Sequence, residues 1–119
     1  MNKLYIIGNL TKDPELRTTI GGKDVCNFTV AVNRRNRSEG QPDADFFRVS
    51  AWEGLARNCA QYLTKGKKVA VVGPVSVQTY NTNDGQTRAD LVVFAQDVEF
   101  LSPRSNGFTP VDVDDNPFA

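Results

Sequence analysis

The sequence has no histidine, one tryptophan and two cysteines among its 119 residues. Histidine is the commonest general base and the commonest metal ligand, so its absence excludes Ser-His-Asp and Cys-His catalysis and histidine-ligated zinc sites. Cys26 and Cys59 fall on the apolar faces of an expected strand and an expected helix, without a paired spacing. We therefore expect both to be reduced core residues of a cytosolic protein, and we expect no cofactor and no metal.

Long hydrophobic runs are also missing. No apolar segment approaches the roughly 18 residues that a membrane-spanning helix needs. The apolar residues 4–7 are followed at once by Gly8 and Asn9, so the patch is too short for a signal peptide. We expect a strand at this position and no membrane partner.

The zero net charge conceals an asymmetry between the two parts of the chain. Residues 1–104 hold all 14 Lys and Arg with 11 Asp and Glu, whereas residues 105–119 hold no base and three Asp. A weakly basic body with an acidic tail is typical of a protein whose body binds a polyanion and whose terminus binds a partner. Phe118 supports this interpretation, because a purely solubilising tail has no use for an apolar ring.

Alternation of apolar and polar residues dominates the body and predicts β-strands. The expected strands lie at residues 4–10, 25–32, 45–52, 69–77 and about 88–100. Gly8 indicates a bulge or a close backbone approach, and Pro74 indicates an edge or a bulge. Residues 91–95 are apolar at every position, so we expect cover on both faces, one of them from another subunit.

One helix is expected at about residues 55–64, because apolar residues recur there on a single stripe. Lys65 and Gly66 then supply a cation in the last turn and a residue that tolerates a left-handed stop. Five strands with a helix between the third and the fourth describe a small Greek-key barrel, an all-β fold. Residues 105–119 are too poor in apolar side chains to pack, so we expect a barrel domain at 1–104 and a disordered acidic tail.

The segment Asp45-Phe-Phe-Arg-Val-Ser-Ala-Trp52 carries the chemistry. Alternation places Phe46, Arg48 and Trp52 on one face of this strand. Exposed rings interleaved with cations suit single-stranded nucleic acid, because bases stack on rings while cations neutralise phosphates. The alternative is that both rings belong to the core or to a subunit interface.

Two loops add to this face. Tyr80 stands beside the expected hairpin turn at residues 81–85, and Arg34, Arg35 and Arg37 cluster in the long loop at 34–43. Such loops form the walls of an oligonucleotide groove on a Greek-key barrel. Each has a plainer explanation when taken alone. Tyr80 would be a packing residue of the hairpin, and the arginine cluster would belong to a solvated loop. Together with the aromatic strand they favour a nucleic-acid site.

With these residues in place, the chain resembles the bacterial-type single-stranded DNA-binding proteins, a homotetrameric OB-fold family. The resemblance covers almost the whole chain. Its motifs are Asn2-Lys-Leu-Tyr-Ile-Ile-Gly-Asn-Leu-Thr-Lys-Asp-Pro-Glu-Leu-Arg17, Asn27-Phe-Thr-Val-Ala31, Phe46-Phe-Arg-Val-Ser-Ala-Trp52, Ala56–Gly66, Val72-Gly-Pro-Val75 and Asp114-Asp-Asn-Pro-Phe118.

The resemblance implies stacking roles for Phe46, Trp52 and Tyr80. It implies phosphate contacts for four cations and for the nearby arginine loop; the four are Lys3, Arg17, Arg48 and Lys65. It also implies a cytoplasmic, nucleoid-associated homotetramer without catalysis, acting in replication, recombination and repair. The tip of the tail would bind replication and repair proteins through Asp112, Asp114, Asp115, Pro117 and Phe118.

This sequence departs from the family pattern at several points. Asn36 stands where many relatives carry a stacking Trp, and residues 76–79 lack the cations often found there. The linker before the tip is only about ten residues, and Ala119 displaces the terminal carboxylate from Phe118 by about 3.5 Å. These departures keep a second hypothesis open, a partner-recruiting primosome-type OB module that binds DNA weakly.

A third hypothesis is a nuclease or another enzyme built on the same fold. Its metal-binding carboxylates would be Asp13 with Glu15, or Asp43 with Asp45. Both pairs stand beside prolines in expected loops, where solvated turn acids are usual, and the chain has no glycine-rich phosphate loop. We therefore expect no enzyme activity.

Overall fold

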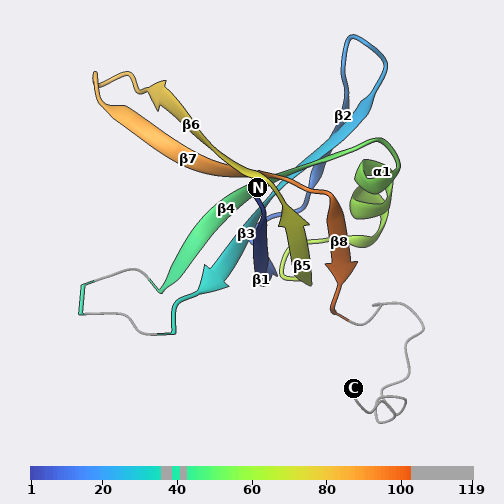
Figure 1. Ribbon diagram of the computed structural model, residues 1–119, viewed down its shortest axis with the longest axis horizontal. Helices are drawn as coiled ribbons and strands as arrows, with labels where there is room; N and C mark the ends of the chain where they lie inside the picture. Colours follow the sequence, from blue (N-terminus) through green and yellow to red (C-terminus); the bar gives the residue numbers. More distant parts are fainter. Residues whose placement is uncertain (36–38, 41–42, 103–119) are drawn as a thin grey trace.

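The computed structural model describes residues 1–35, 39–40 and 43–102 (Figure 1). These residues form eight strands and one helix. In chain order the elements are β1 (Leu4–Leu10), β2 (Glu15–Thr18), β3 (Asp24–Asn33), β4 (Ala44–Trp52), α1 (Glu53–Tyr62), β5 (Lys68–Gly73), β6 (Val75–Asn81), β7 (Thr87–Phe94) and β8 (Asp97–Phe100). No helix within this part of the chain is long and apolar enough to cross a membrane.

The strands follow the order β6-β7-β4-β3-β1-β5-β8, with β2 added beside β3. Strands β5 and β6 are two halves of one extended segment, separated only by Pro74. Because β5 pairs with β1 and β6 pairs with β7, this segment joins the strands from β6 to β5 into a ring, and β8 pairs with β5 outside it. The ring closes through a parallel pairing of β4 with β7. The expected all-β Greek-key barrel with one helix, an OB-fold, is confirmed, with eight strands in place of the five expected.

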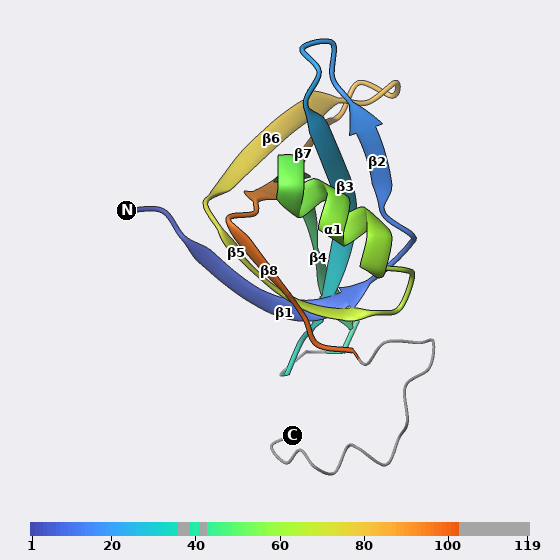
Figure 2. The same cartoon turned by 90° about the vertical axis from the view of Figure 1, so that its right-hand side faces the viewer.

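The barrel interior is filled by alternate residues of its strands. On β3 the buried set includes Cys26, Phe28 and Val30, as the alternation predicts. On one side α1 packs against β3 and β4 and buries Ala56 and Cys59 (Figure 2). Both cysteines are buried and free, which confirms their placement in the core.

Gly8 marks a close approach between two strands, as expected. A Cβ atom at this position would lie 2.2 Å from the carbonyl oxygen of Ala31 on β3. Pro74 separates β5 from β6, and the amide of Phe94 donates to its carbonyl oxygen at 2.9 Å. Both breaks in the pattern therefore mark places where backbones meet at a corner of the barrel.

Three expectations about boundaries were wrong. The helix begins at Glu53 and ends at Tyr62, so Lys65 and Gly66 lie beyond its last turn. Gly66 does adopt a positive φ of 89°, but in a separate turn in which the amide of Lys67 donates to the carbonyl oxygen of Thr64 at 3.1 Å. The other two errors concern the strand count: β2 was not expected, and each of the last two expected strands is divided, 69–77 into β5 and β6 and 88–100 into β7 and β8.

Two hairpins extend away from the barrel (Figure 1). One consists of β2 and β3, the other of β6 and β7. At the end of the second hairpin, Gly85 has a φ of 85° and its amide donates to the carbonyl oxygen of Thr82. The turn expected at residues 81–85 is thus confirmed. The expected tail at 105–119 lies outside the described residues.

Candidate nucleic-acid interface

Strand β4 presents its aromatic residues on the outer face of the barrel. Val49 and Ala51 point inward and are buried, so the alternate residues must point outward. The outward side chains of Phe46 and Trp52 are 59% and 43% exposed. They stand six residues apart, about 20 Å along the strand. Neither ring lies in the core of this chain, which excludes the core from that alternative and leaves the subunit interface.

A groove of about 600 Å³ runs along this outer face. Its floor comes from β3, β4 and β7, and its walls from the segment after β1 and from β6. It is lined by Thr11, Lys12, Asp13, Glu15, Asn27, Phe28, Thr29, Arg48, Val49, Ser50, Gln78, Thr79, Tyr80, Asp90, Val92 and Phe94. Two of the residues expected to contact nucleic acid, Arg48 and Tyr80, therefore line one groove, and Phe46 and Trp52 lie on the same face of β4.

The β6–β7 hairpin forms one wall and positions Tyr80. The ring is 48% exposed, and its cross-strand partner on β7 is Arg88. Directly paired residues of antiparallel strands project to the same face, so Arg88 adds a cation beside the ring. The sequence reasoning missed Arg88, although the turn at 81–85 fixes this register and could have predicted the pair.

Phe94 is a second residue that the sequence reasoning missed. It pairs with Ser50 of β4, lines the groove and is 40% exposed. Its apolar neighbours on both sides concealed it, because residues 91–95 carry no alternation that separates an inner from an outer face. The groove floor therefore contains one more aromatic ring than expected.

Polar side chains on the groove floor are held by partners from the same face. The hydroxyl of Ser50 donates to the Asn27 Oδ1 atom at 2.7 Å. The Arg48 guanidinium forms an ion pair with the Asp90 carboxylate, with Nη1 and Oδ2 separated by 3.2 Å. The expected phosphate ligand Arg48 is thus already paired with a carboxylate.

The charges that line the groove are mixed rather than basic. Lys12 and Arg48 oppose Asp13, Glu15 and Asp90. Outside the groove, at the base of the 34–43 loop, Arg34 also contacts a carboxylate: its Nε and Nη2 atoms lie 3.0 Å and 2.7 Å from Asp45 Oδ1. Any electrostatic attraction of a polyanion must therefore come largely from cations around the groove.

Those surrounding cations lie on different elements. Arg17 on β2 pairs with Val25 of β3, which in turn pairs with Trp52, so Arg17 borders the Trp52 end of the face. The backbone amide of Lys65 donates to Asp13 at 2.8 Å, which fixes the Lys65 turn beside the groove wall.

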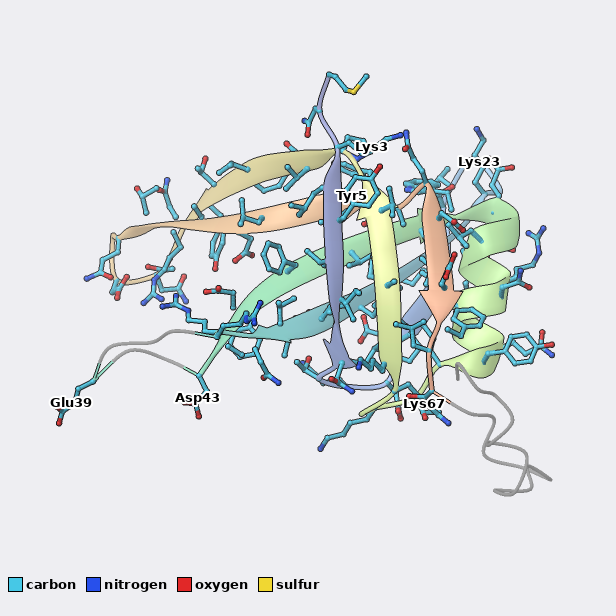
Figure 3. The ribbon with its side chains drawn as sticks, turned by 60° about the horizontal axis from the view of Figure 1, so that its bottom comes forward. Lys3, Tyr5, Lys23, Glu39, Asp43 and Lys67 are labelled. Atoms are coloured by element: carbon cyan, nitrogen blue, oxygen red, sulfur yellow. The ribbon has the colours of Figure 1, made fainter. Side chains whose placement is uncertain are left out.

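The remaining expected contacts are less closely associated with the groove. Lys3 precedes β1, lies next to Tyr5 (Figure 3) and does not line the groove. Arg35 is exposed in the 34–43 loop, whereas Arg37 lies outside the described residues. The same holds for the whole set at the tip, namely Asp112, Asp114, Asp115, Pro117 and Phe118.

The carboxylates considered for a nuclease fall in two places. Asp13 and Glu15 line the groove, and Asp43 and Asp45 lie at the start of β4, with Asp43 labelled in Figure 3. Within residues 1–35, 39–40 and 43–102, no three His, Cys, Asp or Glu side chains are grouped so that they could hold a metal ion.

Comparison with known proteins agrees with this geometry. The chain matches the Single-strand binding protein family over residues 1–101. It is 40% identical to Single-stranded DNA-binding protein 2 of Clostridium acetobutylicum, covering 99% of this chain and 100% of that protein. It is also 40% identical to the Single-stranded DNA-binding protein of Halalkalibacterium halodurans, covering 89% of this chain and 64% of the relative. It is 41% identical to Single-stranded DNA-binding protein 2 of Listeria monocytogenes, covering 89% of this chain and 67% of that protein.

Proposed function

Because this chain belongs to the single-strand binding protein family, we propose that it binds single-stranded DNA along the outer face of β4 and β7 with little regard to base sequence. The observation that carries the proposal is the exposure of Phe46, Trp52 and Tyr80 on one face, around Arg48. Every base has a π-face, so stacking on rings is tolerant of sequence. On the floor, Ser50 is hydrogen-bonded to Asn27 and Arg48 is paired with Asp90, which leaves fewer groups for reading base edges.

In this proposal the rings and the cations have different roles. Phe46, Trp52 and Tyr80 stack on bases. The cations neutralise the DNA backbone, and they comprise Lys3, Arg17, Arg34, Arg35, Arg37, Arg48 and Lys65. Because these cations surround the groove on several elements, the DNA would extend beyond the groove over the neighbouring surface.

The test is a fluorescence titration of Trp52 with poly(dT) at low and high salt. We expect deep quenching that saturates at tens of nucleotides per oligomer and weakens with salt, by about 0.7 log units of affinity per log unit of salt for each phosphate neutralised. An absence of quenching, or an affinity that ignores salt, would refute an aromatic groove that binds phosphates.

The residue assignments have their own test. Phe46→Ala or Trp52→Ala should weaken binding by about 1–3 kcal/mol per lost stack, measured with a labelled oligonucleotide. Tyr62→Ala is the matched control, because Tyr62 is 45% exposed and its ring lies near Phe100 of β8 rather than on the outer face of β4. Equal losses in all three folded variants would remove the face from the binding site.

We further propose that the protein protects single-stranded DNA during replication, recombination and repair in the cytoplasm, associated with the nucleoid, and that it does so without catalysis. Bound oligonucleotide should resist an added nuclease. The protein alone should leave labelled single-stranded DNA intact with Mg²⁺ or Mn²⁺ present. Cleavage in that control would favour the enzyme hypothesis and its carboxylate pairs.

The acidic tip at 112–119 is proposed to recruit replication and repair proteins. Its deletion should abolish their capture while DNA binding stays or strengthens, since a competing polyanion is removed. Wild-type protein that captures partners but scarcely quenches with poly(dT) would instead favour the partner-recruiting module with weak DNA binding. The internally paired Arg48 and the acidic groups of the groove are the observations that keep this second function in view.

The protein is also proposed to act as a homotetramer. Tyr5 lies over the strands β1, β5 and β8 (Figure 3). It is 69% exposed, and Ile7, two residues further along β1, is 55% exposed. Strand β1 pairs with β3 only at Asn9 and Leu10, so its earlier residues offer an open edge for another chain. Sedimentation analysis should give four chains per particle, and Tyr5→Lys with Ile7→Lys should reduce that number.

A further inference from the structure

Arg48 and Asp90 stand at the centre of the groove, on the adjacent strands β4 and β7. Their ion pair of 3.2 Å is the one interaction found for either side chain among the described residues. The Arg48 side chain is 62% exposed and that of Asp90 31%. Asp90 pairs across the β6–β7 hairpin with Gln78, which carries no charge. The carboxylate therefore has Arg48 as its charged partner, and both groups face incoming DNA.

This arrangement changes what Arg48 can offer to a phosphate. The Arg48–Asp90 ion pair as a whole has no net charge with which to neutralise a second anion, so a phosphate must displace Asp90 or share Arg48 with it. In either case Asp90 stays within the groove and repels the DNA backbone. Exposed ion pairs are weak, so the phosphate can win this competition, but at a loss of affinity.

We propose that Asp90 is an internal competitor of DNA phosphate for Arg48, which lowers the affinity for single-stranded DNA and reduces its salt dependence. This inference rests on the proposed function. It assigns Asp90 a role opposite to that of its neighbours on the groove floor, since its removal improves binding. Asp90 acts on the DNA through Arg48 and lowers its affinity, and it is not itself a DNA ligand.

The test is the Asp90→Asn variant, which keeps the shape of the side chain and removes its charge. We expect it to bind a labelled oligo(dT) about three- to tenfold more tightly than the wild type at low salt. The slope of log affinity against log salt should steepen by up to about 0.7, because Arg48 then neutralises one further phosphate. At high salt the two proteins should converge.

Asp24→Asn is the matched control. It also removes one aspartate from an exposed ion pair with an arginine, since Asp24 lies 3.0 Å from Arg57. Asp24 does not line the groove, so this variant reports the general effect of one lost negative charge. A gain in Asp24→Asn equal to that in Asp90→Asn would overturn the proposal.

A second variant shows whether the effect passes through Arg48. In an Arg48→Gln background, Asp90→Asn should improve binding no more than Asp24→Asn does. A full gain in that background, an unchanged affinity of Asp90→Asn, or weaker binding would each overturn the competitor role. Weaker binding would mean that Asp90 positions Arg48 for the DNA. Failure of the wild type to bind oligo(dT) at all would instead refute the proposed function.

Discussion

Replacing Gly8 by alanine should be one of the most damaging single changes in the barrel. The added Cβ would meet the Ala31 carbonyl oxygen at 2.2 Å and a methyl group of Val30 at 2.8 Å, whereas ordinary contacts begin at 3.4 Å. Strand β1 would have to move away from β3 by about 1.2 Å, the difference between 3.4 Å and 2.2 Å. The obstacle is backbone, so no rotamer change of a side chain can relieve it.

The cost follows from what this movement breaks. The pairs Asn9–Ala31 and Leu10–Val30 connect β1 to β3 immediately after Gly8, and each lost hydrogen bond costs about 1 kcal/mol. Leu10 is buried, and loosening the packing around such a side chain costs about 2 kcal/mol or more. We therefore expect Gly8→Ala to lower the free energy of unfolding by about 3–5 kcal/mol, a large part of the total for a domain of this size.

Urea unfolding followed by circular dichroism would measure this loss, at one fixed protein concentration because the proposed assembly would contribute to stability. Gly21→Ala is the matched control: a Cβ there meets nothing closer than 3.9 Å, and Gly21 has no positive φ. It should leave stability unchanged or raise it by up to about 1 kcal/mol. A loss below about 1 kcal/mol for Gly8→Ala would refute the close approach of β1 and β3.

Three further predictions concern other parts of the barrel. The hydrogen bond from Arg57 lowers the pKa of Asp24 below its usual 3.8, so this pair stabilises the fold above that pH and the stabilisation is lost as the pH falls through the lowered pKa. The urea midpoints of the wild type and Asp24→Asn should therefore differ at pH 7 and converge in acid. A difference that stays constant with pH would contradict the pairing. Burial raises the pKa of the Cys59 thiol to about 12, so its alkylation by iodoacetamide should be very slow in native protein and rapid in urea. Fast alkylation of Cys59 in the native protein would contradict its burial. The side-chain amide of Asn2 donates to the Val75 carbonyl oxygen at 2.8 Å and accepts from the Val75 backbone amide at 3.1 Å. Asn2→Ala should therefore lower the free energy of unfolding by about 1 kcal/mol, and an unchanged urea midpoint would show that this contact is not stabilising.

The sequence predicted those parts of the fold in which periodicity and burial agree. Alternation on β3 and β4 identified the inward residues, and Gly8 and Pro74 marked the corners. Strand β2 gave no such signal, because all four of its residues are exposed and none needs to point inward. It exists because its backbone pairs with β3, a contact that depends on the tertiary structure.

The break between β7 and β8 has a similar origin. The amide of Ala95 donates to the Ser50 carbonyl oxygen at 2.9 Å, and the next amide, of Gln96, donates to the Val72 carbonyl oxygen at 2.7 Å. The chain therefore changes partners between two adjacent residues, from β4 to β5. Neither a glycine nor a proline marks the place, so a local pattern could not predict it.

The sequence predicted which residues of the candidate site share a face of one strand, but not which residues meet between strands. Phe46, Arg48 and Trp52 share a face by alternation alone. The ion pair of Arg48 with Asp90 requires the parallel register of β4 against β7, which closes the barrel. These residues are 42 positions apart, and no spacing rule connects them. Charge competition within the groove is therefore a property of the fold rather than of any motif.

The core and the candidate site depend on the same register of β4. A slip by one residue would bring Phe46, Arg48 and Trp52 to the inner face and expose Val49. Burial of a guanidinium without a partner is far more costly than the loss of any single contact in the groove. The buried alternate residues therefore hold the aromatic residues outward without any hydrogen bond to the rings. It follows that the rings themselves can be replaced with little loss of stability, whereas substitutions at the buried Val49 should affect the proposed DNA binding mainly by loosening the barrel.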